Sequence, residues 1–112
     1  MKKKTNYLDK IPACSSEISH ISNDDGTITL LIENKGIANK IAQILLKKPR
    51  ISHIHLDEIG SFVWLMIDGK KSIYDIAVSV DTYFGEKAQP LYERLIVFFN
   101  ILKNNSLIIW IK

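Results

Sequence analysis

A chain of 112 residues, 46% of them hydrophobic and 24% charged, has the composition of one small globular domain, which excludes a disordered protein. The net charge of +3 is too small to require a nucleic-acid partner, and no apolar run reaches the length of a membrane span. The basic start, MKKK, is not followed by the apolar segment of a signal peptide, so we expect a cytoplasmic protein with no membrane partner. Cys14 is the only cysteine, which excludes an intrachain disulfide.

The first third of the chain predicts a tail and a hairpin. Residues 1–15 show no sustained apolar periodicity and are predicted to be a flexible N-terminal tail. Two β-type segments follow, Glu17–Ser22 and Thr27–Glu33. The sequence NDDG between them tolerates the positive φ angles of a tight turn. We therefore expect an antiparallel hairpin.

Residues 34–50 interrupt the strand pattern. The apolar residues at helical spacing are Ile37, Ile41, Ile44 and Leu45. With lysines on the other positions and Pro49 at the end, they predict an extra helix over residues 37–48. The cluster of lysines is consistent either with a solvated helix face or with an anion-binding patch.

The sequence ISHIHL, from residue 51 to residue 56, alternates again and predicts a third strand. Its two faces hold Ile51, His53 and His55 on one side and Ser52, Ile54 and Leu56 on the other. Because the histidines are separated from Ile54 and Leu56, we expect one face to cover the core and the other to be partly open to solvent.

Three helices are predicted in the second half of the chain. Asp57 is suited to cap the first, Gly69 ends it, and Ser72 is suited to cap the second. Gly85 ends the second helix, and Pro90 suits the first turn of the third. Their apolar faces are Ile59, Phe62, Val63, Met66 and Ile67; Ile73, Ile76, Ala77, Val80 and Phe84; and Leu91, Leu95, Phe98, Phe99 and Leu102.

The apolar segment 107–111 predicts a final strand or an extended tail. The fold class is therefore α+β and winged-helix-like: a small antiparallel three-stranded sheet packed on a three-helix bundle, with the extra helix inserted before the third strand. Residues 16–112 are expected to form a single domain, in which residues 34–50 are the inserted segment.

Candidate catalytic and metal-binding residues are few. Asp57, Asp68 and Asp75 lie at helix ends, where capping and the helix dipole account for them. His53 and His55 share one strand face, a spacing that can bind a metal, but a third ligand is missing. The sequence has no phosphate-binding loop, dinucleotide-binding motif or nucleophile motif. We therefore predict no enzyme activity, no bound metal and no cofactor.

A winged-helix domain can also be a DNA-binding transcriptional regulator, whose third helix reads the major groove. The polar positions of the third predicted helix hold Tyr92, Glu93, Arg94, Asn100 and Lys103. A recognition helix usually presents several cationic and amide side chains, whereas here a single arginine stands beside a glutamate that repels phosphate. We expect no specific nucleic-acid binding, and the regulator is kept as the alternative function.

The residues from Asp57 onward resemble the PqqD family. FVWLMIDGKKSIYDIAVSVDTYFG matches its pattern of a tryptophan, a glycine stop, a Ser or Thr helix start and a short acidic-Ile-Ala helix. LYERLIVFFNILKNNSLI looks like the family's last helix. Members of this family, and the related RiPP recognition elements, are non-catalytic proteins of natural product biosynthesis. The resemblance implies that the chain binds the leader of a ribosomally synthesised precursor peptide and presents it to a modifying enzyme, often a radical SAM protein.

In family members the leader adds as an extra strand to the third strand of the sheet, in a groove walled by the third helix. The peptide-binding residues that the resemblance implies are Ile51, Ser52, His53, Ile54, His55 and Leu56 on the strand, and Leu91, Tyr92, Leu95, Phe98, Phe99 and Leu102 on the helix. An open strand edge offers a disordered peptide main-chain hydrogen bonds. It also allows a weak homodimer beside the monomer.

Overall fold

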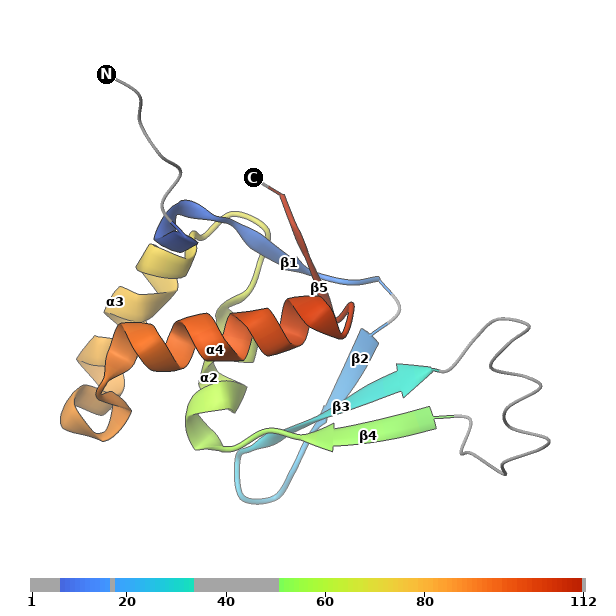
Figure 1. Ribbon diagram of the computed structural model, residues 1–112. Helices are drawn as coiled ribbons and strands as arrows, with labels where there is room; N and C mark the ends of the chain where they lie inside the picture. Colours follow the sequence, from blue (N-terminus) through green and yellow to red (C-terminus); the bar gives the residue numbers. More distant parts are fainter. Residues whose placement is uncertain (1–6, 17, 34–50, 112) are drawn as a thin grey trace. The chain divides into compact units, whose positions relative to one another are not determined.

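The structure is a computed structural model that describes residues 7–16, 18–33 and 51–111 (Figure 1). The predicted helix over residues 37–48 lies outside these ranges. Within them, none of the helices combines the length and the apolar character needed to cross a membrane. Two compact units make up the chain: a sheet unit, Ser16–Asp57, and a helical unit that combines Met1–Ser15 with Glu58–Lys112.

The sheet unit is an antiparallel sheet with the strand order β2-β3-β4 (Figure 1). Its strands are β2 (Ile18–Ser22), β3 (Ile28–Glu33) and β4 (Ile51–His55). In the turn between β2 and β3 the Asn23 N–H donates to the Thr27 carbonyl oxygen at 2.8 Å, and Gly26 takes a φ of 88° that suits glycine. The predicted hairpin and third strand are confirmed.

The helical unit contains the three predicted helices, which are confirmed. They are α2 (Glu58–Met66), α3 (Ile73–Phe84) and α4 (Leu91–Asn104), with a 3-10 turn, η2 (Gly85–Ala88), after α3. The predicted final strand is also present, as β5 (Ile108–Trp110). The fold class is therefore α+β, with a small three-stranded antiparallel sheet and three helices.

Local sequence signals explain where α3 begins. The Ser72 hydroxyl accepts the Asp75 N–H, and the Asp75 carboxylate accepts the Ser72 N–H, which is a capping box. Before it, Gly69 takes a φ of 79°, a conformation that side chains with a Cβ rarely adopt. These residues end α2 and start α3, as the sequence predicts.

The buried side chains of α3 and α4 follow the predicted apolar faces, whereas on α2 only part of the predicted face is buried. On α3, the five predicted positions are all buried. On α2, Val63 and Trp64 are buried, while Phe62 is only half-buried. The other large buried side chains of the unit are Pro12, Ile67, Leu91, Leu95, Phe99, Leu102, Leu107 and Ile108. Trp64 is thus a core residue and not an exposed stacking surface.

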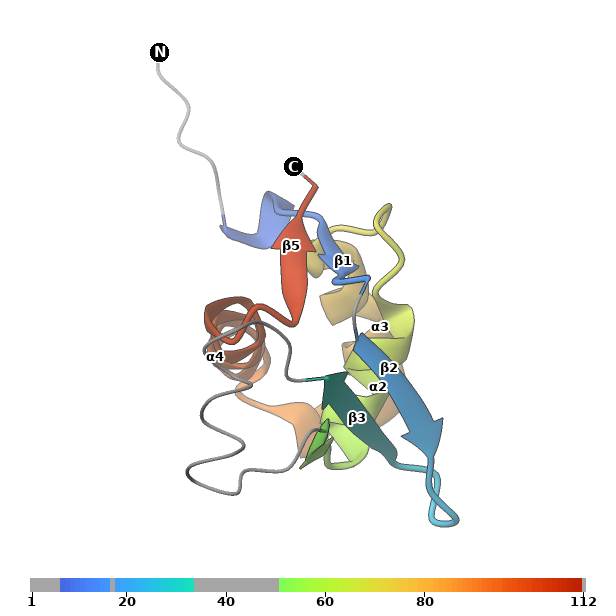
Figure 2. The same cartoon turned by 90° about the vertical axis from the view of Figure 1, so that its right-hand side faces the viewer.

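The segment before the sheet unit differs from the predicted flexible tail. Residues 7–15 form a 3-10 turn, η1 (Tyr7–Asp9), and a strand, β1 (Pro12–Cys14), which pairs antiparallel with β5 (Figure 2). The Tyr7 ring meets the Trp110 ring edge-on at 5.8 Å, and the Lys10 ammonium lies 5.2 Å from the centroid of the same tryptophan. A strand of three residues has too little alternation to be recognised in a sequence, which explains the missed prediction.

Candidate functional site

The open edge of β4 is the main feature of the candidate site. Among the described strands, β4 pairs with β3 on one side and with none on the other. Successive residues of an antiparallel strand direct their backbone N–H and C=O groups to alternate sides. The Leu56 N–H donates to the Ile28 carbonyl oxygen at 2.8 Å, so the backbone groups of Ile54 also face β3. Those of His53 and His55 therefore face the open edge.

The pairing of β3 with β2 agrees with the assignment of backbone groups between β3 and β4. The Asn23 N–H donates to the Thr27 carbonyl oxygen, so the backbone groups of Thr27 and Thr29 face β2. The residues between and beyond them, Ile28 and Leu30, must then face β4. The two ladders of the sheet thus assign the same two sides to β3.

The side chains of β4 are divided between the two sheet faces as the sequence predicts. His53 and His55 are exposed on one face, opposite Leu31 and Thr29 of β3 in the register. Ile54 is half-buried on the other face. A strand added to this edge would therefore meet imidazole rings on one face and an apolar side chain on the other.

A polar network lies beside one of the two imidazoles, that of His55. The Asn23 side-chain amide donates to the hydroxyls of Thr27 and Thr29, both at 3.0 Å, and its nitrogen lies 3.4 Å from Nδ1 of His55. The Thr27 hydroxyl and N–H donate to the Asp25 carboxylate and lower the pKa of Asp25. This network was not predicted. Its signal in the sequence is the alternation of threonines directly after an Asn-Asp turn.

The six residues predicted on α4 do not share one environment. Leu91, Leu95, Phe99 and Leu102 are buried, with 7%, 3%, 0% and 2% of their surfaces exposed. Tyr92 is exposed and Phe98 is half-buried. Two further apolar residues, Val97 and Ile101, are 58% and 53% exposed and lie one turn apart. Sequence reasoning missed this pair, although α4 carries more apolar residues than one buried face needs.

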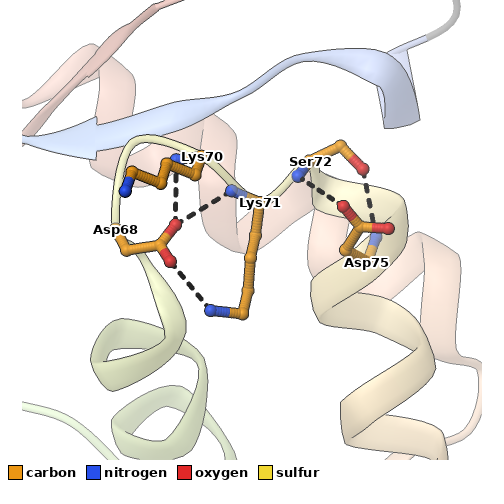
Figure 3. A network of polar contacts seen from close by, with 5 residues as sticks. All are labelled: Asp68, Lys70, Lys71, Ser72 and Asp75. Carbon is orange, nitrogen blue, oxygen red and sulfur yellow. Dashed lines mark hydrogen bonds and ion pairs between the residues drawn. The ribbon is translucent and has the colours of Figure 1, made fainter.

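The carboxylates beside α2 and α3 have structural partners (Figure 3). Asp68 accepts the backbone N–H groups of Lys70 and Lys71 at 2.9 Å and pairs with the Lys71 ammonium at 2.8 Å. The Lys71 ammonium and these N–H groups hold the pKa of Asp68 well below its ordinary value. Asp75 belongs to the capping box of Ser72. The predictions that Asp68 bonds locally and that Asp75 suits the start of a helix are confirmed.

The three histidines do not converge on one point. In the register, His20 and Ile54 both lie opposite Leu30, which puts His20 on the face that carries Ile54 and away from His53 and His55. Across the described ranges, no group of three His, Cys, Asp or Glu side chains could hold a metal ion.

Two of the polar residues of α4 that could read DNA already have partners within the helical unit. The Arg94 guanidinium donates to the Lys87 carbonyl oxygen at 2.8 Å. Asn100 accepts the Tyr7 hydroxyl at 2.8 Å. A recognition helix needs donors such as the Arg94 guanidinium pointing into a groove, so the contact of Arg94 with Lys87 weighs against the DNA-binding alternative.

Comparison with protein families gives one match. The family described as coenzyme PQQ synthesis protein D (PqqD) matches residues 33–108, which is more than half of the chain. The matched region includes β4 and all three helices. Searches of curated proteins and of solved structures found no match.

Proposed function

Because the chain belongs to the PqqD family, whose members are accessory proteins of biosynthesis, we propose that it binds the leader of a ribosomally synthesised precursor peptide along the open edge of β4. In this proposal it presents the leader to a modifying enzyme, for which a radical SAM protein is the expected class. The chain itself has no catalytic role.

The observation that carries the proposal is the alternation of backbone groups along β4. The N–H and C=O groups of His53 and His55 face a side on which no described strand pairs. An extended peptide can satisfy these groups by adding as a further antiparallel strand, because strand addition needs only main-chain hydrogen bonds. The family match covers β4, which favours this edge of the sheet.

Main-chain bonds alone are too weak for a useful complex. About four such bonds, at about 0.5–1.5 kcal/mol each, come to about 2–6 kcal/mol before the cost of ordering the peptide. A micromolar complex requires about 8 kcal/mol. Side-chain anchors must therefore supply the remainder. We propose that apolar residues of α4 contribute to them, and the candidates are the exposed Tyr92, Val97 and Ile101 and the half-buried Phe98.

Amide chemical shifts provide the test. The full-length protein, labelled with ¹⁵N, is titrated with the synthetic leader of a candidate precursor peptide. We expect the largest shift changes at residues 51–56, with a second group at residues 91–102. A scrambled peptide of the same composition is the matched control and should cause no saturable change.

Two results would contradict the proposal. Saturable changes confined to residues 37–48 would mean that the peptide binds the inserted segment, and that the family geometry has been carried over wrongly. Binding of one DNA duplex about a thousandfold more tightly than random duplexes would favour the transcriptional regulator.

A further inference from the structure

We propose that two copies of the chain associate through β5, which pairs as an antiparallel strand with β5 of the second copy. In the proposed register, Ile109 lies directly opposite Ile109 of the second copy. The pairing uses no residue of the sheet unit. The inference therefore goes beyond the proposed function and does not rest on it.

Among the described strands, β5 pairs only with β1 (Figure 2). The Ile111 N–H donates to the Ile11 carbonyl oxygen at 2.7 Å. The backbone groups of Ile109, two residues earlier, therefore also face β1. Those of Ile108 and Trp110 face the opposite side, on which no described strand pairs.

The other side of β1 is already occupied. The Pro12 carbonyl oxygen accepts the Gly69 N–H at 3.1 Å, and the Lys10 carbonyl oxygen accepts the Ile73 N–H at 2.9 Å. Pro12 also has no N–H to offer on that side. The ribbon formed by β1 and β5 can therefore be extended only at β5.

One register lets β5 complete its backbone hydrogen bonds with a copy of itself. When Ile109 lies opposite Ile109 of the second copy, Ile108 lies opposite Trp110 of the second copy, and Trp110 opposite Ile108. Each of these two pairs exchanges N–H···O bonds in both directions, because the groups involved face each other. A register centred on Ile108 would instead need the N–H of Ser106, which already donates to the Lys103 carbonyl oxygen at 3.0 Å.

The side chains that this register brings together are all apolar. Ile109 is 50% exposed and meets its own copy, while the half-buried Trp110 meets Ile108. Pairs of β-branched and aromatic residues across two strands stabilise a sheet. Residues 107–111 carry no charge, so like charges do not oppose the pairing of two copies.

The edge strands of the sheet unit are less suited to self-pairing. If β2 or β4 paired about its central residue, His20 or His53, two imidazoles would lie directly opposite each other. Imidazoles are polar, and they repel each other once they take up protons near pH 6.5 or below. The strand β5 has no titratable side chain.

The family match also favours a second copy over the leader as the partner of β5. The match ends at residue 108, so Ile109 and Trp110 lie outside it. The edge of β5 is thus distinct from the edge of β4, which the match includes.

The experiment measures the exchange of backbone amides with solvent by NMR, on the full-length protein at increasing concentration, together with sedimentation equilibrium. Because the interface is small, we expect a weak dimer with a dissociation constant of about 0.1–1 mM. Exchange at Ile108 and Trp110 should slow as the concentration rises. Exchange at Ile109, whose N–H faces β1, should not change.

Charged substitutions at position 109 test the register. Ile109→Lys and Ile109→Glu should each weaken association about tenfold or more, because like charges then lie directly opposite each other. Mixing the two variants should restore association, because opposite charges then face each other.

Ile111→Lys and Ile111→Glu are the matched controls. Ile111 is 54% exposed and lies on the same face of β5 as Ile109. In the proposed register it lies about 13 Å along the strand from its own copy. Mixing these two variants should therefore not strengthen association over either variant alone.

Each other outcome would overturn the proposal. Restoration only on mixing Ile109→Lys with Ile111→Glu would mean a different register, and slower exchange at His53 instead would place the contact on β4. Exchange at Ile108 and Trp110 that slows only with added synthetic leader would make the leader the partner of β5. Exchange and sedimentation that do not change with concentration would mean a monomer. Far-UV circular dichroism of the variants establishes that the exposed substitutions leave the fold intact.

Discussion

The two edge strands of the three-stranded sheet, β2 and β4, are equal in length but differ in which sheet face carries the side chains of their open-edge residues. Each has five residues and pairs with β3 on one side. On β4, the residues whose backbone groups face the open edge include His53 and His55. On β2, the pairing of Asn23 with Thr27 puts Ile18, His20 and Ser22 in that role. The open-edge residues of the two strands thus carry their side chains on opposite faces of the sheet.

An edge without a paired strand is not by itself evidence of a binding site. Both edges offer backbone groups with which no described strand pairs, and such groups could pair with any extended chain. Side chains and family membership distinguish them. The family match begins at residue 33, so it includes β4 and excludes β2. The substitutions below test whether the distinction holds.

The largest expected effect is on folding, from Ile54→Pro. The N–H of Ile54 faces β3, so proline there removes a bond inside the sheet and leaves a carbonyl group of β3 without its donor. We expect the free energy of unfolding to fall by about 1–3 kcal/mol, measured by urea denaturation. An unchanged free energy of unfolding would mean that the backbone sides of β4 are assigned the wrong way round.

His53→Pro, one position away, should separate binding from folding. Its N–H faces the open edge, where proline is tolerated, so stability should change by less than about 1 kcal/mol. Leader binding, measured by calorimetry, should weaken about tenfold or more. The leader loses one main-chain hydrogen-bond donor, and the proline ring obstructs the edge.

His20→Pro is the matched substitution on the edge of β2. The N–H of His20 also faces an open edge, so both stability and leader binding should stay near wild-type values. If His20→Pro abolished leader binding and His53→Pro did not, the peptide would pair with β2 and the comparison of the two edges would be reversed.

A further effect is expected from α4, outside the sheet unit. Tyr92→Ala should weaken leader binding by roughly 1–3 kcal/mol if its ring anchors the peptide. Tyr74→Ala on α3 is the control, because Tyr74 is 50% exposed and Tyr92 is 45% exposed. The two variants should differ in calorimetric affinity. Equal affinities would remove Tyr92 from the site and leave Val97 and Ile101 as the candidates on α4.

The sequence was sufficient for the parts of the fold that repeat a pattern. The apolar face of α3 and the cap at Ser72 were both predicted, since periodicity and capping chemistry are local properties. The strand β1 was missed because three residues contain no readable period. For the site, the alternation of ISHIHL predicted the two faces of β4.

The rest of the site depends on partners that are distant in the chain. The side of β4 that each backbone group faces depends on its register with β3, which is fixed by a bond from Leu56 to Ile28. The contact of His55 with Asn23 joins residues 32 positions apart. The sequence alone predicts that proline at position 54 removes a hydrogen-bond donor. Only the register shows that this donor bonds to β3, so that β3 and not the peptide loses its partner.

The smallest expected effect concerns the acid dependence of the turn beside His55. The Thr27 hydroxyl and N–H stabilise the ionised form of Asp25 and lower its pKa in the folded state. The ionised carboxylate therefore contributes stability above the ordinary Asp value of about 4, and this contribution is lost as the pH falls through the lower, folded-state pKa. Asp25→Asn should lose less stability than the wild type between neutral pH and about pH 3, measured by urea denaturation at each pH. Thr27→Val loses the hydroxyl but keeps the N–H donor, so its acid dependence should lie between those of Asp25→Asn and the wild type. Thr27→Ser keeps both donors and should behave like the wild type. If all four proteins lost stability equally on acidification, the hydrogen bonds to Asp25 would not stabilise the turn.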